Sequence, residues 1–478
     1  MVRLKLRAHA CFLLLCVLPI AAQSWTPLNN KATFGASTAL LLTNGVVMAQ
    51  DGEASDWWQL KPDNTGSYIN GTWTQVASLP SGYGPLYYAS AVLPDGRLLI
   101  EGGEYNLGSQ SETNLGAIYD PVANTWTAVA PPSGWSNIGD APGIVLPNGV
   151  FMLANPFGTN MVTFNASTFA WTAVGSGKAD SFSEEGMTLL PSGDVMVVDT
   201  ENGTHAERYN INLKRWGNAN STLVLLPSNG NMGIVPELGP AVLRPDGTVF
   251  VAGATGNTAI YFPSASRAGT GFWEVGPVFP SGVAADAPGA LLPDGNVLVP
   301  SSPFFVAPTA FFEFDGFNLN SVPAPPNAVN TPSFVGRLLV LPTGQILYTD
   351  GSADVEIYTP AGTYNQAWAP LITSAPASVT RGTTNSISGE RFNGLSAGAA
   401  YGDDAQMATN YPLIRIVNNS TGHVFYAKTH GHSTMAVATG NRIVSTNFDV
   451  PSSMETGAST LYVVANGIPS FGVAVTVN

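Results

Sequence analysis

Acidic side chains recur at one place in the sequence, a few residues before a tight turn that ends in glycine. Asp140, Glu184 and Asp286 each lie six residues before the first residue of such a turn, and Glu237 lies seven residues before another. Carboxylates gathered at one point repel one another unless a cation, raised pKa values or open water relieves the repulsion. The spacing therefore predicts a site for a metal ion or a polyhydroxy ligand. A solvated acidic rim is the alternative.

Two more side chains belong to this set. Glu185 directly follows Glu184, and Tyr87 lies six residues before the turn of the second copy. The corresponding positions in three other copies hold Ala36, Leu238 and Val335. The predicted ligand-binding residues are Tyr87, Asp140, Glu184, Glu185, Glu237 and Asp286.

Histidine supplies the other candidate ligands. His430 and His432 form a His-x-His pair within the segment from Thr429 to Thr434. On a strand, both rings of such a pair point to one face and can chelate a metal ion. We predict that one divalent metal ion is held through His430 or His432, without choosing between them. A surface loop is the alternative.

Several kinds of catalysis are excluded by what the sequence lacks. Cys11 and Cys16 are the only cysteines, and both lie near the N-terminus. The mature chain is therefore expected to have no disulfide and no thiolate. The motifs of serine hydrolases, phosphate-binding loops and zinc proteases are absent. Paired carboxylates could hydrolyse glycosides, but spacing between repeats does not give their separation.

The acidic positions are defined by seven sequence repeats. Each has a few apolar residues, a turn of the Leu-Pro-Asp-Gly type and further apolar residues, and the turns end at Gly45, Gly96, Gly149, Gly193, Gly247, Gly295 and Gly344. Asn-Gly or Asp-Gly supplies the positive φ of a tight hairpin, and the flanks are typical of strands buried on both faces. A period of about 50 residues predicts an all-β, seven-bladed β-propeller. An open β-solenoid would use shorter repeats.

A tryptophan recurs later in most repeats. These residues are Trp73, Trp126, Trp171, Trp216, Trp273 and Trp368. We expect them to pack between neighbouring sheets and not to take part in catalysis. In a propeller, the residue before each first strand faces the mouth of the central channel, so the acids should converge there.

The charge and the N-terminus indicate where the protein acts. The net charge of −14 disfavours nucleic acid and anionic lipid as partners. Arg3, Lys5 and Arg7 precede an apolar stretch from Ala10 to Ala22 that is too short to span a membrane comfortably. We expect a signal peptide and a secreted, extracellular protein, periplasmic if the source is Gram-negative.

The pattern changes near Pro370. No further propeller turn follows, and about 100 residues with several short strands predict a β-sandwich. The expected organisation is a signal peptide over 1–23, a seven-bladed β-propeller over 24–370 and an immunoglobulin-like β-sandwich over 371–478.

Two segments resemble known families. The hairpins, with Tyr119 seven residues before Trp126 and with Gly102-Gly103 after a second strand, resemble Kelch repeats. The segment from Gly351 to Pro360 resembles the last blade of the galactose oxidase family. The resemblance covers about residues 30 to 478. It implies a seven-bladed Kelch propeller followed by an immunoglobulin-like (E-set) domain.

Some of the family's functional positions match this sequence and others do not. There, a loop of the C-terminal domain brings a copper-binding His to the propeller mouth, and His430 or His432 falls at about that place. The family also cross-links a Cys to a Tyr, and Tyr87 matches that Tyr but has no mature Cys partner. Phe334 and Val335 occupy the positions of two copper ligands, and neither side chain binds copper. The resemblance therefore implies the fold without the Tyr-Cys copper cofactor, and a copper-radical alcohol oxidase is argued against.

Three functions follow from these observations. The first is a secreted module that binds a polar ligand, expected to be a carbohydrate, at the channel mouth. The second is a metal-dependent, non-radical, carbohydrate-active enzyme. The third is an extracellular scaffold that binds another protein. The sequence does not choose between an enzyme and a binding protein, and it assigns no catalytic residue.

Overall fold

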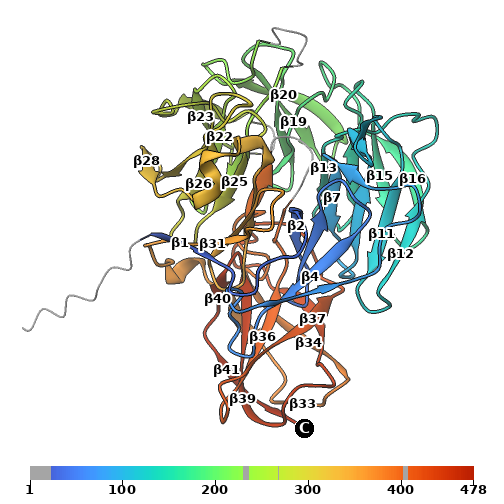
Figure 1. The fold of residues 1–478 in the computed structure, drawn as a ribbon, viewed down its shortest axis with the longest axis vertical. Coiled ribbons are helices and arrows are strands. Elements are labelled where there is room, and N and C mark those ends of the chain that lie inside the picture. Colours follow the sequence, from blue (N-terminus) through green and yellow to red (C-terminus); the bar gives the residue numbers. More distant parts are fainter. Residues whose placement is uncertain (1–22, 230–235, 267–268, 402–406) are drawn as a thin grey trace, which may run out of the picture.

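The structure, a computed structural model, describes residues 23–229, 236–266, 269–401 and 407–478. All but one residue of the expected signal peptide, 1–23, lies outside the described residues. The fold is all-β. Small sheets from the first 359 residues are arranged around a common centre and are called the ring below, and the C-terminal part, from Leu371 onward, lies mostly below them (Figure 1). Within the described residues, no helix has the length and apolar character needed to cross a membrane.

Each predicted repeat forms one antiparallel sheet, and its strands follow one another in chain order. The first sheet contains β2 (Ala36–Leu41), β3 (Val47–Asp51), β4 (Trp57–Lys61) and β5 (Thr72–Gln75), and the second contains β7 (Ala89–Val92), β8 (Leu98–Glu101), β11 (Gly116–Asp120) and β12 (Thr125–Val129). The third contains β13 (Gly143–Val145), β14 (Phe151–Ala154), β15 (Met161–Asn165) and β16 (Ala170–Val174), and the fourth contains β17 (Thr188–Leu189), β18 (Val195–Val198), β19 (His205–Asn210) and β20 (Arg215–Ser221). The fifth contains β21 (Ala241–Leu243), β22 (Val249–Ala252), β23 (Thr258–Phe262) and β24 (Phe272–Val275). First strands of successive sheets contact one another, β2 with β7 and β7 with β13, and so lie toward the centre.

The sixth and seventh sheets each include a strand from elsewhere in the chain. The sixth contains β25 (Pro288–Leu291), β26 (Val297–Ser301), β27 (Ala310–Phe314), β28 (Leu319–Val322) and the later β35 (Ala399–Tyr401). The seventh contains β29 (Arg337–Val340), β30 (Ile346–Thr349), β31 (Glu356–Thr359) and the N-terminal β1 (Ser24–Pro27). Short 3-10 turns are η1 (Pro326–Val329), η2 (Ser333–Val335) and η3 (Gln366–Trp368).

The turn glycines behave as the sequence predicts. Gly45, Gly96 and Gly295 have φ of 75°, 84° and 91°, and the other four turn glycines also have positive φ. The strands beside these turns are buried on both faces, as in β2, β7 and β8. The recurring tryptophans link neighbouring sheets, because Trp126 Nε1 donates to Ala77 O at 2.9 Å and Trp273 Nε1 donates to Ala219 O at 2.8 Å.

The C-terminal part has its own apolar core and lies against the turns of the ring. Its strands are β32 (Leu371–Ser374), β33 (Ser378–Val379), β34 (Thr384–Glu390), β36 (Leu413–Asn418), β37 (Val424–His430), β38 (Val444–Asp449), β39 (Gly457–Ala465), β40 (Ile468–Pro469) and β41 (Val473–Val477). One buried cluster contains only residues between Val379 and Val477. Gly431 N donates to Pro94 O and Met435 N to Pro147 O, both at 2.9 Å. Pro94 and Pro147 belong to the glycine turns, so this part covers the end of the ring that carries those turns, called the turn end below.

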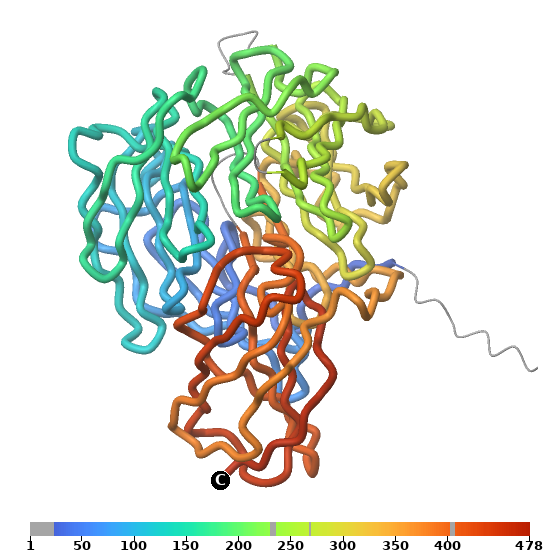
Figure 2. The backbone as a smooth tube through the Cα atoms, turned by 180° about the vertical axis from the view of Figure 1, so that it is seen from behind, coloured from blue at the N-terminus to red at the C-terminus, as the bar shows by residue number. Residues whose placement is uncertain are grey.

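One segment of the C-terminal part rises into the centre of the ring (Figures 1 and 2). Its strand β35 pairs with β25, and Leu291 N donates to Gly398 O at 2.7 Å. The side chain of Tyr401, at the end of β35, donates to Phe334 O at 2.7 Å. The central channel is therefore occupied by chain that comes from outside the ring.

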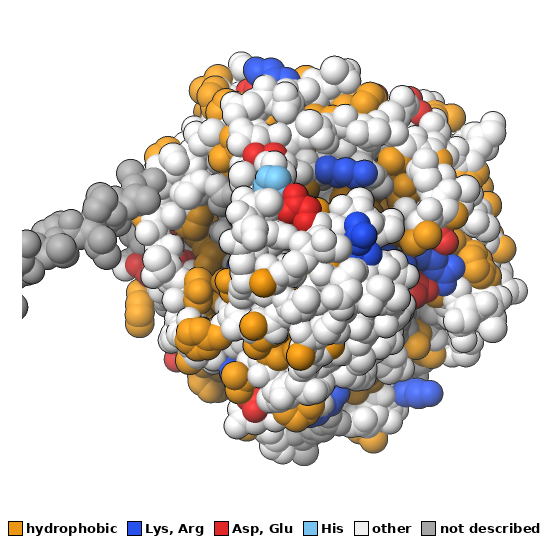
Figure 3. All heavy atoms as spheres, turned by 90° about the horizontal axis from the view of Figure 1, so that it is seen from below, with side chains coloured by type: hydrophobic (Ala, Val, Ile, Leu, Met, Phe, Trp, Pro, Cys, Tyr) orange, Lys and Arg blue, Asp and Glu red, His pale blue; other side chains and the backbone are white. Residues whose placement is uncertain are grey.

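The surface of the C-terminal side carries little charge. Seen from below, uncharged polar and hydrophobic side chains cover most of it, and charged ones lie in small groups (Figure 3). This matches a sequence in which only 10% of residues are charged.

The conformation of Gly398 provides a test of the inserted segment. Its φ is 96°, and a Cβ there would lie 2.6 Å from Thr409 Oγ1. We predict that Gly398→Ala lowers the free energy of unfolding by about 1 to 3 kcal/mol. Gly158→Ala is the control, since a Cβ at Gly158 meets no atom within 4 Å. Calorimetry of both variants would contradict this account if their unfolding temperatures were equal.

Candidate functional site

A cavity of about 610 Å³ lies at the end of the ring where the first strands begin. One set of lining residues is acidic: Glu104, Glu112, Asp140, Glu184, Glu237 and Asp286. A second set is aromatic: Tyr87, Tyr105, Phe157, Phe305, Phe334 and Tyr401. Five of the six residues predicted as ligand-binding therefore lie around one cavity, and Glu185 is not among the lining residues.

Three of the carboxylates are close together. Glu184, Glu237 and Asp286 each place a ligand oxygen within 4.8 Å of the others. They precede β17, β21 and β25, the first strands of three successive sheets. Because first strands converge on the centre of the ring, residues about 50 positions apart in sequence meet there.

The backbone around the cavity is held in an uncommon conformation. Tyr87, Glu112, Glu184 and Asp286 have φ of 50°, 47°, 55° and 45°. Residues other than glycine seldom adopt positive φ, and such positions cluster where a fold must aim a side chain. Three of the four occupy the same position in the repeat, so the strain recurs with the repeat.

Burial weakens three of the acids that line the cavity. The pKa of Glu237 is raised to about 7, chiefly by burial. The negative charge of Asp140 also raises this pKa, whereas hydrogen bonds with Asp286 and Glu184 lower it. Burial, together with the charge of Asp140, raises the pKa of Glu112 to about 7. Burial also raises the pKa of Asp140 to about 6. These groups therefore share protons near neutral pH.

Tyr401 forms part of the aromatic wall and was not predicted from the sequence. Its ring lies nearly parallel to that of Tyr87, with centroids 6.3 Å apart and planes 10° apart. The Arg337 guanidinium lies 3.6 Å from the Tyr401 ring centroid and donates to the carbonyls of Phe334 and Gly336, both at 2.9 Å. Arg337 is 1% exposed, so it supports the wall from behind.

Glu185 belongs to a separate, buried ion-pair network. Lys178 Nζ lies 3.1 Å from Glu185, 3.2 Å from Asp199 and 2.8 Å from Glu207, and it also pairs with Asp180. Burial alone would lower the pKa of Lys178, but the surrounding carboxylates raise it. The lysine therefore occupies the space that a cation would need, and it anchors the segment that carries Glu184.

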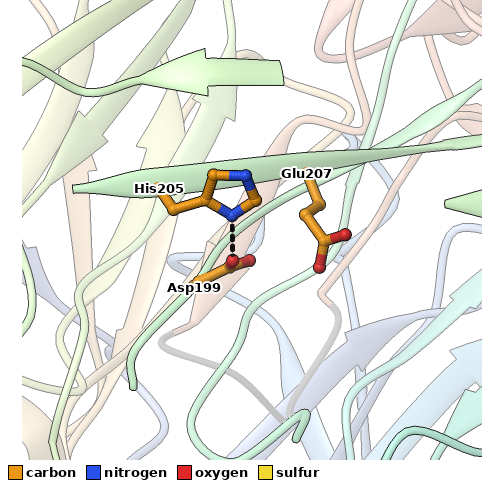
Figure 4. Close-up of side chains that lie close together, drawn as sticks. All are labelled: Asp199, His205 and Glu207. Carbon is orange, nitrogen blue, oxygen red and sulfur yellow. Dashed lines mark hydrogen bonds and ion pairs between the residues drawn. The ribbon is translucent and has the colours of Figure 1, made fainter. Parts of the chain in front are cut away.

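Figure 4 shows the strand that completes this network. His205 and Glu207 both come from β19, and His205 Nδ1 is hydrogen-bonded to Asp199. Alternate residues of a strand share one face, which explains why the two side chains point the same way. Glu184 and Glu185 are adjacent in an irregular segment and diverge, because Glu184 lines the cavity while Glu185 pairs with Lys178.

The histidine pair does not reach the carboxylates. His430 and His432 lie near the turn end of the ring, where Gly431 contacts Pro94. The cavity carboxylates Asp140, Glu184 and Asp286 lie six residues before those turns, which is roughly 20 Å of extended chain. His430 Nε2 lies 3.1 Å from Asp449, and His432 Nδ1 lies 2.9 Å from Thr446 Oγ1.

The surroundings of His432 make it a weak base. Burial, and to a smaller extent the charge of His430, lower its pKa to about 3, so it is neutral near pH 7. The role expected of the histidine loop, contact with the cavity, belongs instead to the segment that ends at Tyr401.

Further lining residues come from an insertion in the second repeat. The chain between β8 and β11 forms β9 (Tyr105–Asn106) and β10 (Ser109–Gln110), which pair with β6 (Pro85–Leu86) in a separate sheet. It supplies Glu104, Tyr105, Gln110 and Glu112 to the cavity. The longer spacing after Gly102-Gly103 was the signal in the sequence that could have revealed it.

Comparisons with known proteins show the fold. No protein-family model and no curated protein matches the chain. Among solved structures, a fungal alcohol oxidase of the AA5 family in complex with copper matches 96% of this chain and 100% of its own, with 11% identity and a TM-score of 0.54. The chain has a galactose oxidase-like β-propeller fold. At this identity the likeness concerns the fold alone.

Two other matches are more distant. The extracellular domain of a hybrid two-component system from B. thetaiotaomicron has 11% identity and a TM-score of 0.48, with 96% of this chain and 59% of that chain covered. YjhT has 14% identity and a TM-score of 0.40, with 62% and 99% covered.

Among the described residues that line the cavity, the position that the resemblance gives to one copper ligand holds a side chain that does not bind copper. Phe334, at the position of one ligand, lines the cavity with a phenyl ring. Its carbonyl accepts hydrogen bonds from Tyr401 and Arg337. The oxygen-rich trio of Glu184, Glu237 and Asp286 is instead typical of sites for hard cations or for groups that donate hydrogen bonds.

The buried acids predict a pH-dependent stability. A carboxyl whose pKa rises on folding favours the folded state at low pH and loses that contribution as pH rises from about 4.5 to about 7. Glu237→Gln should therefore raise the free energy of unfolding at pH 8 by about 1 to 3 kcal/mol, with a smaller effect near pH 4.

Urea unfolding at the two pH values measures this difference. Glu274→Gln, on the exposed face of β24, is the matched control and should change little at either pH. An equal effect of Glu237→Gln at both pH values would show that the cavity acids do not titrate as described.

Proposed function

We propose that this chain binds a carbohydrate in the cavity at the channel mouth. The observation that carries the proposal is a single cavity with carboxylates in one set of lining residues and aromatic rings in the other. Carboxylate oxygens accept hydrogen bonds from sugar hydroxyls, and aromatic rings pack against the apolar C–H face of a pyranose. The volume of about 610 Å³ suits a small-molecule site.

The proposal includes the finer architecture. We take the seven sheets as the seven blades of a Kelch-type propeller over 24–370, and 371–478 as an immunoglobulin-like sandwich. The correspondence of one repeat to one sheet supports the first assignment. The separate core of the C-terminal strands supports the second. The basic and apolar N-terminal segment supports secretion to the extracellular space.

Substitutions on the two sides of the cavity test carbohydrate binding. Asp286→Asn removes one acidic acceptor, and Phe157→Ala removes an aromatic ring that is already 58% exposed. We expect Asp286→Asn to weaken binding by about tenfold or more and Phe157→Ala by about threefold or more. Calorimetric titration with oligosaccharides identified on a glycan array measures both.

The control for these titrations is Glu274→Gln, which is exposed on β24 and should leave affinity unchanged. If a glycan binds and neither cavity variant weakens it, the cavity is not the binding site. If no glycan binds at millimolar concentration, the proposed function is wrong.

A second candidate is a metal-dependent, carbohydrate-active enzyme. It is favoured by the approach of Glu184, Glu237 and Asp286 to within 4.8 Å of one another. Three carboxylates suit Ca²⁺, which prefers oxygen ligands. His430 and His432 lie elsewhere and take no part in this version of the site.

Metal binding has a direct test. Ca²⁺ should raise the unfolding temperature of the wild-type chain and not that of Asp286→Asn, because a ligand that binds only the folded state stabilises it. Elemental analysis of the purified protein gives the resident metal. A metal-free protein whose unfolding temperature ignores added Ca²⁺ would reject this candidate.

A further inference from the structure

We infer that the bound saccharide carries a positively charged amino group, as a de-N-acetylated amino sugar does. The inference rests on the proposed carbohydrate function and names the class of sugar that this cavity fits. It follows from the charge balance of the lining, from one unsatisfied acceptor and from the aromatic wall.

The lining is strongly unbalanced in charge. Among the described residues that line the cavity, six are carboxylic acids and none is lysine, arginine or histidine. Arg337 lies behind the wall, where its guanidinium contacts Tyr401 and backbone carbonyls. The pKa values of Glu112, Asp140 and Glu237 are raised to about 6 to 7, so the excess of negative charge over the one buried cation grows as the pH rises through neutrality. A neutral sugar would add no charge to offset it.

Glu237 presents an acceptor that nothing in the described structure satisfies. Glu237 is 4% exposed as a residue and lines the cavity. Its Oε2 has no hydrogen-bond partner among the described residues. Buried polar atoms are nearly always satisfied, so this oxygen points to a donor supplied by a ligand. An ammonium group has three donors, enough for Glu237 and for the neighbouring Glu184 and Asp286.

The aromatic wall favours an organic ammonium over a bare metal ion. A cation near an aromatic face gains from the electrons of the ring, and the same face packs on the apolar side of a sugar. A metal ion held by the three close carboxylates would leave Tyr87, Tyr401 and the rest of the cavity unused. An amino sugar uses both sets of lining residues at once.

Binding of the amine should be linked to pH. The pKa of Glu112 and of Glu237 is raised to about 7 and that of Asp140 to about 6, chiefly by burial. Lowering the pH protonates these acids and removes the charge that attracts the ammonium. The other titratable or charged groups against the cavity are Glu104, Glu184, Asp286, Tyr87, Tyr105, Tyr401 and the supporting Arg337. Affinity should therefore fall between about pH 7 and pH 5.

The experiment compares three probes on the purified full chain. They are a glucosamine oligosaccharide, its N-acetylated counterpart of equal length, and spermidine, a cation without a sugar. Calorimetric titration at about pH 6.5 keeps much of the amine protonated while part of the cavity acid is ionised. We expect the glucosamine oligosaccharide to bind at least about tenfold more tightly than either other probe.

Variants assign the difference to the cavity. Glu237→Gln should remove the preference for the amine, so that the glucosamine oligosaccharide and its N-acetylated counterpart bind this variant with affinities within about twofold of each other. Glu274→Gln, exposed on β24, should behave as the wild type. Circular dichroism and unfolding temperature establish that each variant is folded.

The outcomes separate the inference from the proposed function. Equal or tighter binding of the N-acetylated probe overturns the inference and leaves carbohydrate binding standing. Spermidine binding as tightly as the amino sugar, or no binding by any saccharide, overturns the carbohydrate function itself. Ca²⁺ binding that Glu237→Gln abolishes, without amine binding, makes the cavity a metal site and overturns the inference.

Discussion

The pairing of β1 with β31 joins the beginning of the ring to its end. Ser24 to Pro27 lie in register with Thr359 to Glu356, so the N-terminal strand completes the last sheet. Trp25 reinforces the join, with its ring 4.9 Å from Tyr358 and 5.6 Å from Tyr348. Each sheet needs a neighbour on both faces to bury its apolar side chains, and closure supplies neighbours for the first and last sheets. The positions of the first strands, and hence of the cavity, depend on it.

Closure has an electrostatic cost at the centre. The same geometry that brings first strands together also brings together the acids that precede them. The fold accommodates these acids through a raised pKa at Glu237 and through left-handed backbone at Glu184 and Asp286. Both features oppose stability, and neither is needed to close the ring. Their concentration around one cavity is the main physical reason to regard it as a functional site.

The hairpins and most of the cavity acids could be predicted from the sequence, because the repeat gives equivalent positions in each sheet. The turn glycines locate the hairpins, and counting back from them finds Asp140, Glu184 and Asp286. The count could not separate Glu184 from Glu185, since the direction of a side chain in an irregular segment depends on its partners, here Lys178. The placement of His430 was expected from a family resemblance, and sequence position alone does not show which end of the ring a loop reaches.

The remaining lining residues lay beyond this kind of reasoning. Glu112 comes from an insertion outside the repeat, and Tyr401 comes from a segment whose partner strand, β25, is more than 100 residues earlier. Neither has a local pattern that indicates its position. The galactose oxidase-like fold shown by comparison accounts for the propeller and does not specify what lines its mouth.

The insertion of β35 beside β25 has a consequence for how the protein matures. The ring residues are synthesised first. The cavity lacks the aromatic ring of Tyr401 until β35 has been made and has paired with β25. A chain that stops short of β35 lacks this lining and also the core contacts of Ala399 and Tyr401. On the proposed function, such a truncated product would bind its ligand less well than the full chain.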